Sequence, residues 1–275
     1  MKICYLNIGC GAKAHPSWHN VDLNPCLPNA IAMDASKPLP FHDASMDVVY
    51  SSAMIEHLDR PAVPIFLKEC LRVLTQGGIL RIGVPDFERA CRLYLEKLEA
   101  AYCGIPGAAL DHEWMIIEMI DQFVRDVSGG EMARVLARPE LPNLSFIVDR
   151  IGVDGEIIRN SLLRQAASSK QDGSATPSLF RRVRFLLTRW LTGFSGRELF
   201  VGRFRMSGEV HRWAYDRFSV SVLLKQAGFV QTLVQNPYSS RIPDWEKFRL
   251  DVAEDGRSLK PDLLYVEALK PKSGR

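Results

Sequence analysis

Residues 6–25 read LNIGCGAKAHPSWHNVDLNP, and this stretch decides how the chain is expected to fold. An apolar strand runs into Gly9-Cys10-Gly11, and a second short strand ends at Asp22. Gly9 and Gly11 let the backbone approach a ligand closely, because neither residue carries a Cβ atom. A carboxylate at the position of Asp22 can accept hydrogen bonds from both hydroxyls of a ribose. The stretch therefore predicts a nucleoside site at the carboxyl ends of parallel strands.

The connection between these two strands is too short for a dinucleotide site. Residues 9–14, GCGAKA, match G-x-G-x-x-A, but only Ala12–Ser17 separate the glycine turn from the second strand. Pro16 disfavours helix in the residues before it. A dinucleotide site needs a full helix whose N-terminus faces the pyrophosphate, with its acidic residue about 20 positions after the glycines. Asp22 comes only eleven residues after Gly11, so a ligand without phosphate fits better.

The alternation of strand and helix continues beyond this stretch. In the first 85 residues we expect strands over Lys2–Ile8, His19–Leu23, Ala30–Met33, Met46–Ser52 and Gly78–Val84. Near-continuous apolar runs such as the last two are typical of parallel strands covered on both faces. Apolar residues at three- and four-residue steps predict a helix over Pro61–Thr75, which Gln76-Gly77-Gly78 is expected to end. Near the C-terminus a helix is expected over Arg217–Gln226, with strands over Phe229–Gln235 and Leu263–Leu269.

A helical segment separates the two alternating regions. Asp86 can cap a helix that runs to Tyr102, and further helices fit residues 111–127, 130–137, 154–168 and 178–192. This stretch is much longer than an ordinary connection between strands, so it predicts a large helical insertion after the fifth strand. We expect a core of residues 1–85 and 211–275, and an insertion of residues 86–210 that forms the substrate or lid region.

Three motifs occur in order and resemble those of a known family. They are LNIGCG…VDLNP in residues 6–25, MDVVYSSAMIEHL in residues 46–58, and FLKECLRVLTQGGILRIGVPD in residues 66–86. Together they resemble the class I S-adenosylmethionine-dependent methyltransferases, in particular the type 11 branch. The resemblance covers residues 3–86 well and 211–269 loosely. It implies an α/β, Rossmann-like fold with a seven-stranded, mostly parallel sheet of order 3-2-1-4-5-7-6, whose last strand is antiparallel, and S-adenosylmethionine as cofactor.

The resemblance also implies which residues bind the cofactor: Asn7, Gly9, Cys10, Gly11, Asp22, Asp34, Ala35, Ser51 and Ser52. Gly9 and Gly11 would line the methionine and ribose parts, and Asp22 would bind the ribose hydroxyls. Asp34 would face the adenine amino group, and the serines would lie under the sulfonium. Ala12–Ser17 are expected to loop over the methionine end, with Lys13 or His15 near its carboxylate.

Methyl transfer from a sulfonium requires positioning and exclusion of water, and a base only where the acceptor must lose a proton. His57, at the rim after the fourth strand, and His211, before the last helix, are the catalytic candidates. For each of them a role in packing or hydrogen bonding is the alternative. The consecutive residues Asp111, His112 and Glu113 point to different sides of a helix, so no metal site is expected there.

The charge of the chain is modest but unevenly distributed. A formal net charge of +3 over 275 residues does not indicate a nucleic-acid binder, and a small-molecule or glycan acceptor is the expected partner. Residues 179–194, LFRRVRFLLTRWLTGF, are basic, aromatic and apolar. Three alternatives stay open for this segment: an amphipathic helix in peripheral contact with an anionic membrane, a lid facing an anionic substrate, and a helix packed on the domain with solvated arginines.

None of the six cysteines forms a CxxC pair with another. No leader is expected before the first strand, and no apolar run reaches the roughly 18 residues of a membrane span. We therefore expect a cytoplasmic S-adenosylmethionine-dependent methyltransferase that modifies glycans, methylating the oxygen of a sugar or another small hydroxyl-bearing acceptor. A catalytically inactive, methyltransferase-like binding module is one alternative. An NAD-dependent oxidoreductase is another, but it requires pyrophosphate contacts that the short connection does not offer.

Overall fold

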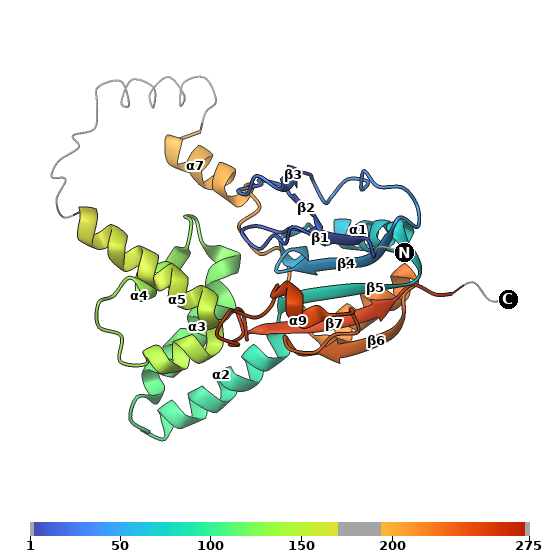
Figure 1. Cartoon of the computed structure of the whole chain (residues 1–275). Helices are drawn as coiled ribbons and strands as arrows, with labels where there is room; N and C mark the ends of the chain where they lie inside the picture. Colours follow the sequence, from blue (N-terminus) through green and yellow to red (C-terminus); the bar gives the residue numbers. More distant parts are fainter. Residues whose placement is uncertain (1–2, 170–193, 273–275) are drawn as a thin grey trace.

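The computed structural model describes residues 3–169 and 194–272, and in these residues it contains a seven-stranded sheet (Figure 1). The strands are β1 Tyr5–Ile8, β2 His19–Asp22, β3 Ala30–Ala32, β4 Met46–Ser52, β5 Leu74–Pro85, β6 Val230–Gln235 and β7 Leu263–Leu269. They lie in the order β3-β2-β1-β4-β5-β7-β6. β1 to β5 pair in parallel, whereas β7 is antiparallel to both β5 and β6. The predicted fold, strand order and antiparallel last strand are confirmed.

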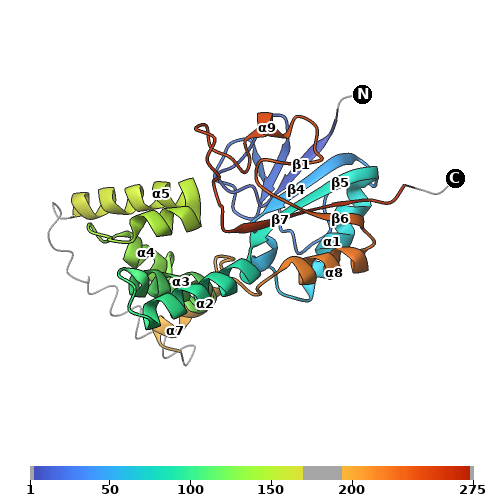
Figure 2. The same ribbon diagram turned by 90° about the horizontal axis from the view of Figure 1, so that it is seen from below.

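The two faces of the sheet are covered differently (Figure 2). Helices α1 Ala62–Val73 and α8 Arg217–Ala227 lie on one face, where side chains such as Phe66 and Leu224 are buried in the main core. The short helix α9 Trp245–Phe248 and its flanking loops cover the other face, where Trp18, Tyr50 and Trp245 form a second cluster. Burial of apolar side chains on both faces explains the continuous apolar runs of β4 and β5.

The connection between β1 and β2 contains no helix, as the sequence predicts. Two buried amide side chains hold it instead. Asn7 Nδ2 donates to the carbonyl of Lys13 at 2.8 Å and to Oδ1 of Asn20 at 3.1 Å. Asn20 Nδ2 donates to the carbonyls of His15 and Trp18, each at 2.9 Å. These bonds satisfy backbone groups that a helix would otherwise pair, so a short loop is stable here.

The predicted end of the helix before β5 is wrong. α1 ends at Val73, and the chain becomes extended at Leu74, where β5 begins. Leu74 is fully buried and pairs with Met46, whereas the next paired residue of β5 is Ile79. The strand therefore bulges around Gly77, whose φ of +74° suits glycine. Burial of Leu74 in the core outweighs the turn signal of the glycines.

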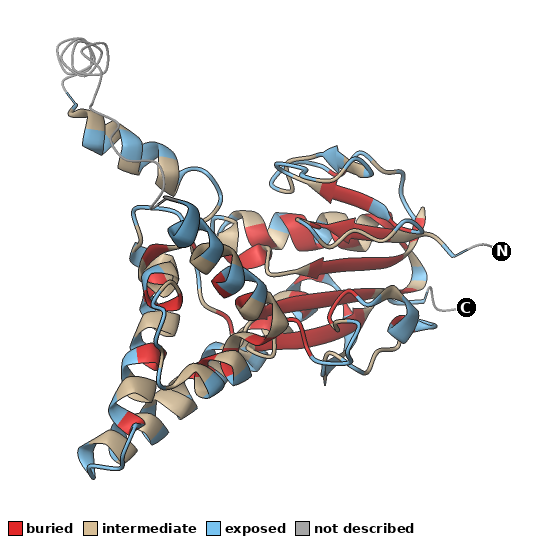
Figure 3. Ribbon diagram, turned by 60° about the vertical axis from the view of Figure 1, so that its left-hand side comes forward, coloured by how far each residue is buried: buried red, intermediate tan, exposed pale blue. Residues whose placement is uncertain are grey.

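Five described helices lie between β5 and residue 211, so the predicted helical insertion after the fifth strand is confirmed. They are α2 Phe87–Tyr102, α3 Ala108–Val124, α4 Gly130–Leu136, α5 Leu144–Ser169 and α7 Gly196–Arg205. α2 to α5 share a core of their own around Trp114, Met115 and Ile147. Buried residues are sparser in these helices than in the sheet (Figure 3). The division into domains at residues 85/86 and 210/211 stays a prediction.

Helix α5 is interrupted at Gly152, and at this point the insertion contacts the loop before β7. Gly152 has φ 63° and ψ −157°, and a Cβ atom there would lie 2.4 Å from Cδ of Pro261. Beyond the break, the N–H of Asp154 donates to the carbonyl of Leu259 at 3.1 Å. The predicted helix over 154–168 is thus the second half of a longer, kinked element, held against the loop before β7.

The predicted helix over 178–192 lies outside the described residues, as does the basic segment 179–194 apart from its last residue, Phe194. The three alternatives for that segment therefore stay open. Among the helices that the structure describes, none is both long and apolar enough to cross a bilayer.

Candidate functional site

A cavity of about 400 Å³ lies at the carboxyl ends of β1, β2 and β4. All but two of the residues predicted for the site line it: Asn7, Gly9, Cys10, Gly11, Asp22, Asp34, Ala35, Ser52 and His57. The exceptions are Ser51 and His211. Because parallel strands end at the same edge of the sheet, residues that follow three different strands meet in one crevice.

The glycine turn after β1 forms one wall of this cavity. The N–H groups of Gly9 and Cys10 both donate to the carbonyl of Val21, at 2.9 and 3.2 Å. Gly9 has a φ of +72°, and a Cβ atom there would lie 2.5 Å from Cγ of Met54. Only glycine fits this position. Burial raises the pKa of the Cys10 thiol to about 11, so Cys10 is a neutral thiol at pH 7.

Asp22 is oriented by backbone groups on both sides. Its Oδ2 accepts from the N–H of Gly11 at 2.8 Å, and its Oδ1 accepts from the N–H of Asn24 at 2.9 Å. Each carboxylate oxygen has two acceptor positions, so each keeps one for a ligand. The carboxylate is thus fixed beside the cavity, with an acceptor free on each oxygen for a pair of adjacent hydroxyls.

Asp34 lies on the wall of the same cavity, beyond β3. Its Oδ1 accepts from the N–H and the hydroxyl of Ser36, at 3.0 and 2.6 Å. These hydrogen bonds, together with the charge of Lys37, hold the pKa of Asp34 below its usual value. An ionised carboxylate here can accept a hydrogen bond from an exocyclic amino group.

Ser51 is not where the resemblance would put it. Its side chain is 1% exposed and does not line the cavity, whereas Tyr50 and Ser52 do. Successive residues of a strand point to opposite faces of the sheet, and the cavity lies on the side of Tyr50 and Ser52. A contact between the Ser51 side chain and the cofactor therefore does not follow from this structure.

An ion pair joins the glycine-turn loop to the insertion across the cavity. Nζ of Lys13 lies 3.1 Å from Oδ1 of Asp154, and both residues line the cavity. His15 does not line it and instead contacts the ring of Phe248, with the ring centroids 5.1 Å apart. Of the two residues expected near the methionine carboxylate, Lys13 is therefore the one at the cavity.

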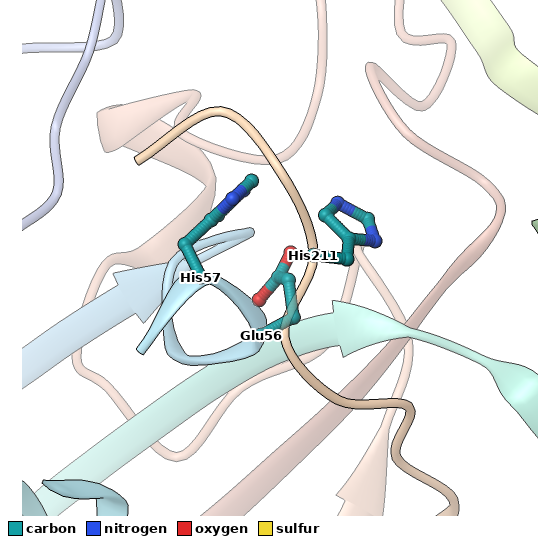
Figure 4. Close-up of side chains that lie close together, drawn as sticks. All are labelled: Glu56, His57 and His211. Atoms are coloured by element: carbon teal, nitrogen blue, oxygen red, sulfur yellow. The ribbon is translucent and has the colours of Figure 1, made fainter. Parts of the chain in front are cut away.

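At the rim of the cavity, Glu56, His57 and His211 lie together (Figure 4). Glu56 and His57 belong to the short 3-10 helix η1 Ile55–His57, directly after β4, and His211 comes from the loop before α8. The ring centroids of the two histidines are 4.7 Å apart. The N–H of Arg212 donates to the carbonyl of Glu56 at 2.6 Å, which binds the two backbone segments to each other.

Burial sets the protonation of these three groups. The carboxylate of Glu56 is 1% exposed, and neither oxygen has a hydrogen-bond partner among the described residues. Burial raises the pKa of Glu56 to about 7. Burial also lowers the pKa of His57 to about 4 and that of His211 to about 3. Both imidazoles are therefore neutral at pH 7, and a neutral imidazole has one nitrogen lone pair that can bind a proton or a metal.

Part of the cavity wall was not predicted from the sequence. Asp154, Gly208 and Lys260 line it, and all three lie outside the matched motifs. The segment between β6 and β7 has no regular apolar period, so its contribution was not readable. The triplet Lys260-Pro261-Asp262, a turn signal directly before an apolar strand, is the one local hint that this segment approaches the crevice.

Residues 6–82 match a family model described as a methyltransferase domain. The match covers the three motifs on which the resemblance to methyltransferases rests, and it agrees with that resemblance for this part of the chain. No curated protein matches the chain significantly.

Solved structures of methyltransferases resemble the chain at low identity. A methyltransferase from Archaeoglobus fulgidus is 13% identical, with 98% of this chain and 87% of that chain covered and a TM-score of 0.40. One from Thermotoga maritima is 13% identical, with 97% and 82% covered and a TM-score of 0.38. Phosphoethanolamine N-methyltransferase 2 of Haemonchus contortus, in complex with S-adenosyl-L-methionine, is 12% identical, with 99% and 50% covered and a TM-score of 0.37.

Proposed function

From the methyltransferase domain at residues 6–82 we infer that this protein uses S-adenosylmethionine, and we propose that it methylates a hydroxyl of a sugar or another small acceptor. The observation that carries the proposal is the fixed carboxylate of Asp22 beside the turn at Gly9, at the carboxyl ends of β1 and β2. The proposed location is the cytoplasm.

Several groups at the cavity suit parts of S-adenosylmethionine, which supports the proposal. Asp22 has an acceptor free on each oxygen for the two ribose hydroxyls, and Asp34 offers an ionised acceptor to the adenine amino group. The turn at Gly9 brings backbone close to the cavity where a side chain would collide with Met54. A volume of about 400 Å³ is within the usual range for small-molecule sites.

S-adenosylmethionine, when bound, supplies a methyl group that is already activated on a sulfonium. The chain must then hold the acceptor oxygen in line with the methyl group and keep water away from it. His57 lines the cavity, while Asp154 and Gly208 bring the insertion to the same wall. We propose that this side, between η1 and the insertion, receives the acceptor.

An NAD-dependent reaction is disfavoured by the same geometry. Residues 12–17 form a loop held by Asn7 and Asn20, so no helix N-terminus faces the cavity at the glycine turn. A pyrophosphate would lack the backbone N–H groups and the helix dipole that hold it in dinucleotide sites.

Isothermal titration calorimetry with S-adenosylhomocysteine tests the cofactor, with NAD⁺ titrated under the same conditions as the comparison. We expect S-adenosylhomocysteine to bind with a stoichiometry of one and NAD⁺ not to bind. Methyl transfer from radiolabelled S-adenosylmethionine to a panel of sugars and glycosides tests the acceptor class. Binding of NAD⁺ without S-adenosylhomocysteine would contradict the proposal, and binding of S-adenosylhomocysteine with transfer only to amines would overturn the hydroxyl acceptor.

A further inference from the structure

The most unusual buried group in the described part of the chain is the carboxylate of Glu56. It is 1% exposed, and neither oxygen accepts a hydrogen bond from any described residue. Nδ1 of His57, next to it in sequence, is also buried without a partner there. Buried polar atoms are nearly always hydrogen-bonded, and each exception requires an explanation such as a bound ion or water.

The third group is His211, which a different part of the chain brings to the same place. One potential ligand atom from each of Glu56, His57 and His211 lies within 4.8 Å of the others. In a tetrahedral zinc site, with bonds of about 2.0–2.2 Å, such atoms lie roughly 3.4 Å apart. Separations of up to 4.8 Å would close to that value by modest rotations of the three side chains.

We propose that Glu56, His57 and His211 bind a divalent transition-metal ion, with zinc as the best fit. Two imidazole nitrogens and one carboxylate oxygen are a ligand set that zinc adopts in sites with three protein ligands. Harder cations such as Mg²⁺ prefer oxygen ligands only. Two observations carry the proposal: the unpartnered oxygens of Glu56 and Nδ1 of His57 in η1, and the proximity of His211 from the loop before α8.

The charges around the cluster are compatible with a cation. Arg125 is near, but its Nη1 lies 3.4 Å from Oε1 of Glu209. The charge of Lys260 acts on the carboxylate of Asp262 as well as on Glu56. Arg125 is thus paired with a carboxylate, and the carboxylate of Asp262 lies near enough to Lys260 to offset part of its charge. Both histidines are neutral, as metal ligands must be, because burial lowers their pKa values.

The place of the cluster indicates what the ion would do. A zinc ion with three protein ligands keeps a further position for water or substrate. His57 lines the proposed cofactor cavity, so the cluster borders the side where we place the acceptor. An ion there would bind the acceptor hydroxyl oxygen and lower the pKa of that hydroxyl. This role, unlike the site itself, rests on the proposed function.

The test is calorimetric titration of the untagged, chelator-treated full chain with ZnCl₂, with Co²⁺ absorption as a second readout of imidazole coordination. The variants are Glu56→Gln and His211→Gln, and the matched control is His112→Gln. His112 is also a half-buried histidine with a buried, unpartnered nitrogen among the described residues, but it lies against Tyr94 in the insertion. Circular dichroism and thermal unfolding show whether each variant folds.

We expect one zinc ion per chain. Loss of a ligand should weaken zinc binding by about 100-fold or more, because even the loss of an outer hydrogen-bond partner costs about 10–100-fold. His112→Gln should bind zinc like the wild type. Failure of the wild type to bind zinc, or equal binding by folded Glu56→Gln, would overturn the proposal. S-adenosylhomocysteine titrated into the same samples separates that outcome from failure of the methyltransferase proposal.

Discussion

Two clusters of buried charged side chains differ in how completely they are paired. Arg81 is fully buried, and all five of its N–H donors are used, on Asp251, Glu267 and the carbonyls of Ser239 and Asn236. Glu56 is buried to the same degree, yet its carboxylate accepts no hydrogen bond from the residues that the structure describes.

The difference separates a structural cluster from a binding cluster. Arg81 joins β5 and β7 to the loops on the face of α9, and every charge in its cluster has a partner within 3 Å. Such a network fixes one arrangement of the backbone. Both oxygens of Glu56 and the Nδ1 of His57 have no partner among the described residues, and the cluster borders the cavity through His57. A group that costs stability and is nevertheless buried at a cavity is expected to serve a ligand.

The largest effect is expected from breaking the paired cluster. Arg81→Met leaves Asp251 and Glu267 buried without their counter-charge, which should lower the free energy of unfolding by about 3–5 kcal/mol. Urea unfolding followed by circular dichroism measures it. Arg257→Met is the matched control, because Arg257 forms ion pairs with Glu156 and Asp255 at the exposed surface. If both variants lose the same free energy of unfolding, the buried ion pairs of Arg81 stabilise the fold no more than the exposed ion pairs of Arg257 do.

In the unpaired cluster, removing the charge of Glu56 is expected to raise the free energy of unfolding rather than lower it. Burial raises the pKa of Glu56 from 4.5 to about 7, so the folded state holds a proton that the unfolded state releases between these values. Stability of the metal-free protein should therefore fall as the pH rises from about 4.5 to 7. Glu56→Gln removes the ionisable group and with it this pH-dependent loss of stability.

With chelator present at pH 8, Glu56→Gln should therefore be more stable than the wild type by roughly 3 kcal/mol. At pH 4.5 the two proteins should unfold alike, because Glu56 is then protonated in the folded protein. Urea unfolding at both pH values is the measurement. A Glu56→Gln variant that is less stable than the wild type at pH 8 would show that the carboxylate has a favourable partner. Glu56 and Arg81 would then both be paired, and the two clusters would no longer differ in this respect.

Asp22 is intermediate between Arg81, which is fully paired, and Glu56, which is unpaired among the described residues. Each carboxylate oxygen of Asp22 has one backbone partner and one acceptor position left. Asp22→Ala should weaken binding of S-adenosylhomocysteine by about 1.5–3 kcal/mol, the usual value of hydrogen bonds to a charged group. Asp22→Asn, which keeps one acceptor oxygen, should lose less. Calorimetry gives both values, and unchanged affinity in Asp22→Ala would mean that the spare acceptors do not meet the ribose.

The smallest effect is expected at Ser51, whose side chain points away from the cavity. Ser51→Ala should change the affinity for S-adenosylhomocysteine by less than about 0.5 kcal/mol, as substitutions away from a site usually do. Gly9→Ala is the contrasting variant, because its Cβ atom would meet Met54. A large loss of affinity in Ser51→Ala would place that hydroxyl on the cofactor, as the resemblance implied.

Much of the sheet could be predicted because its signals are local. The apolar runs of β4 and β5, the turn at Gly9 and the acid at Asp22 are each contained within a few residues. The motif order then implied the strand order that the structure shows. The boundary between α1 and β5 was predicted wrongly because a long-range contact sets it. Leu74 pairs with Met46, so β5 begins before the glycines that were expected to separate helix from strand.

The site could be predicted only where it follows the strands. The predicted residues at the ends of β1 to β4 line the cavity except Ser51, because a resemblance does not show to which face of the sheet a side chain points. Glu56 and His211 are separated by the whole insertion, so no spacing rule brings them together. In the folded chain, hydrogen bonds from the N–H of Arg212 to the Glu56 carbonyl and from the N–H of His211 to the Gln122 carbonyl hold this segment in place.

The most direct test of the account is a crystal structure of the protein with S-adenosylhomocysteine. We expect the ribose hydroxyls within hydrogen-bond distance of the Asp22 carboxylate, the adenine at Asp34 and the homocysteine end at the turn of Gly9. Ligand bound elsewhere, with the Asp22 carboxylate free of it, would contradict the assignment of this cavity as the cofactor site.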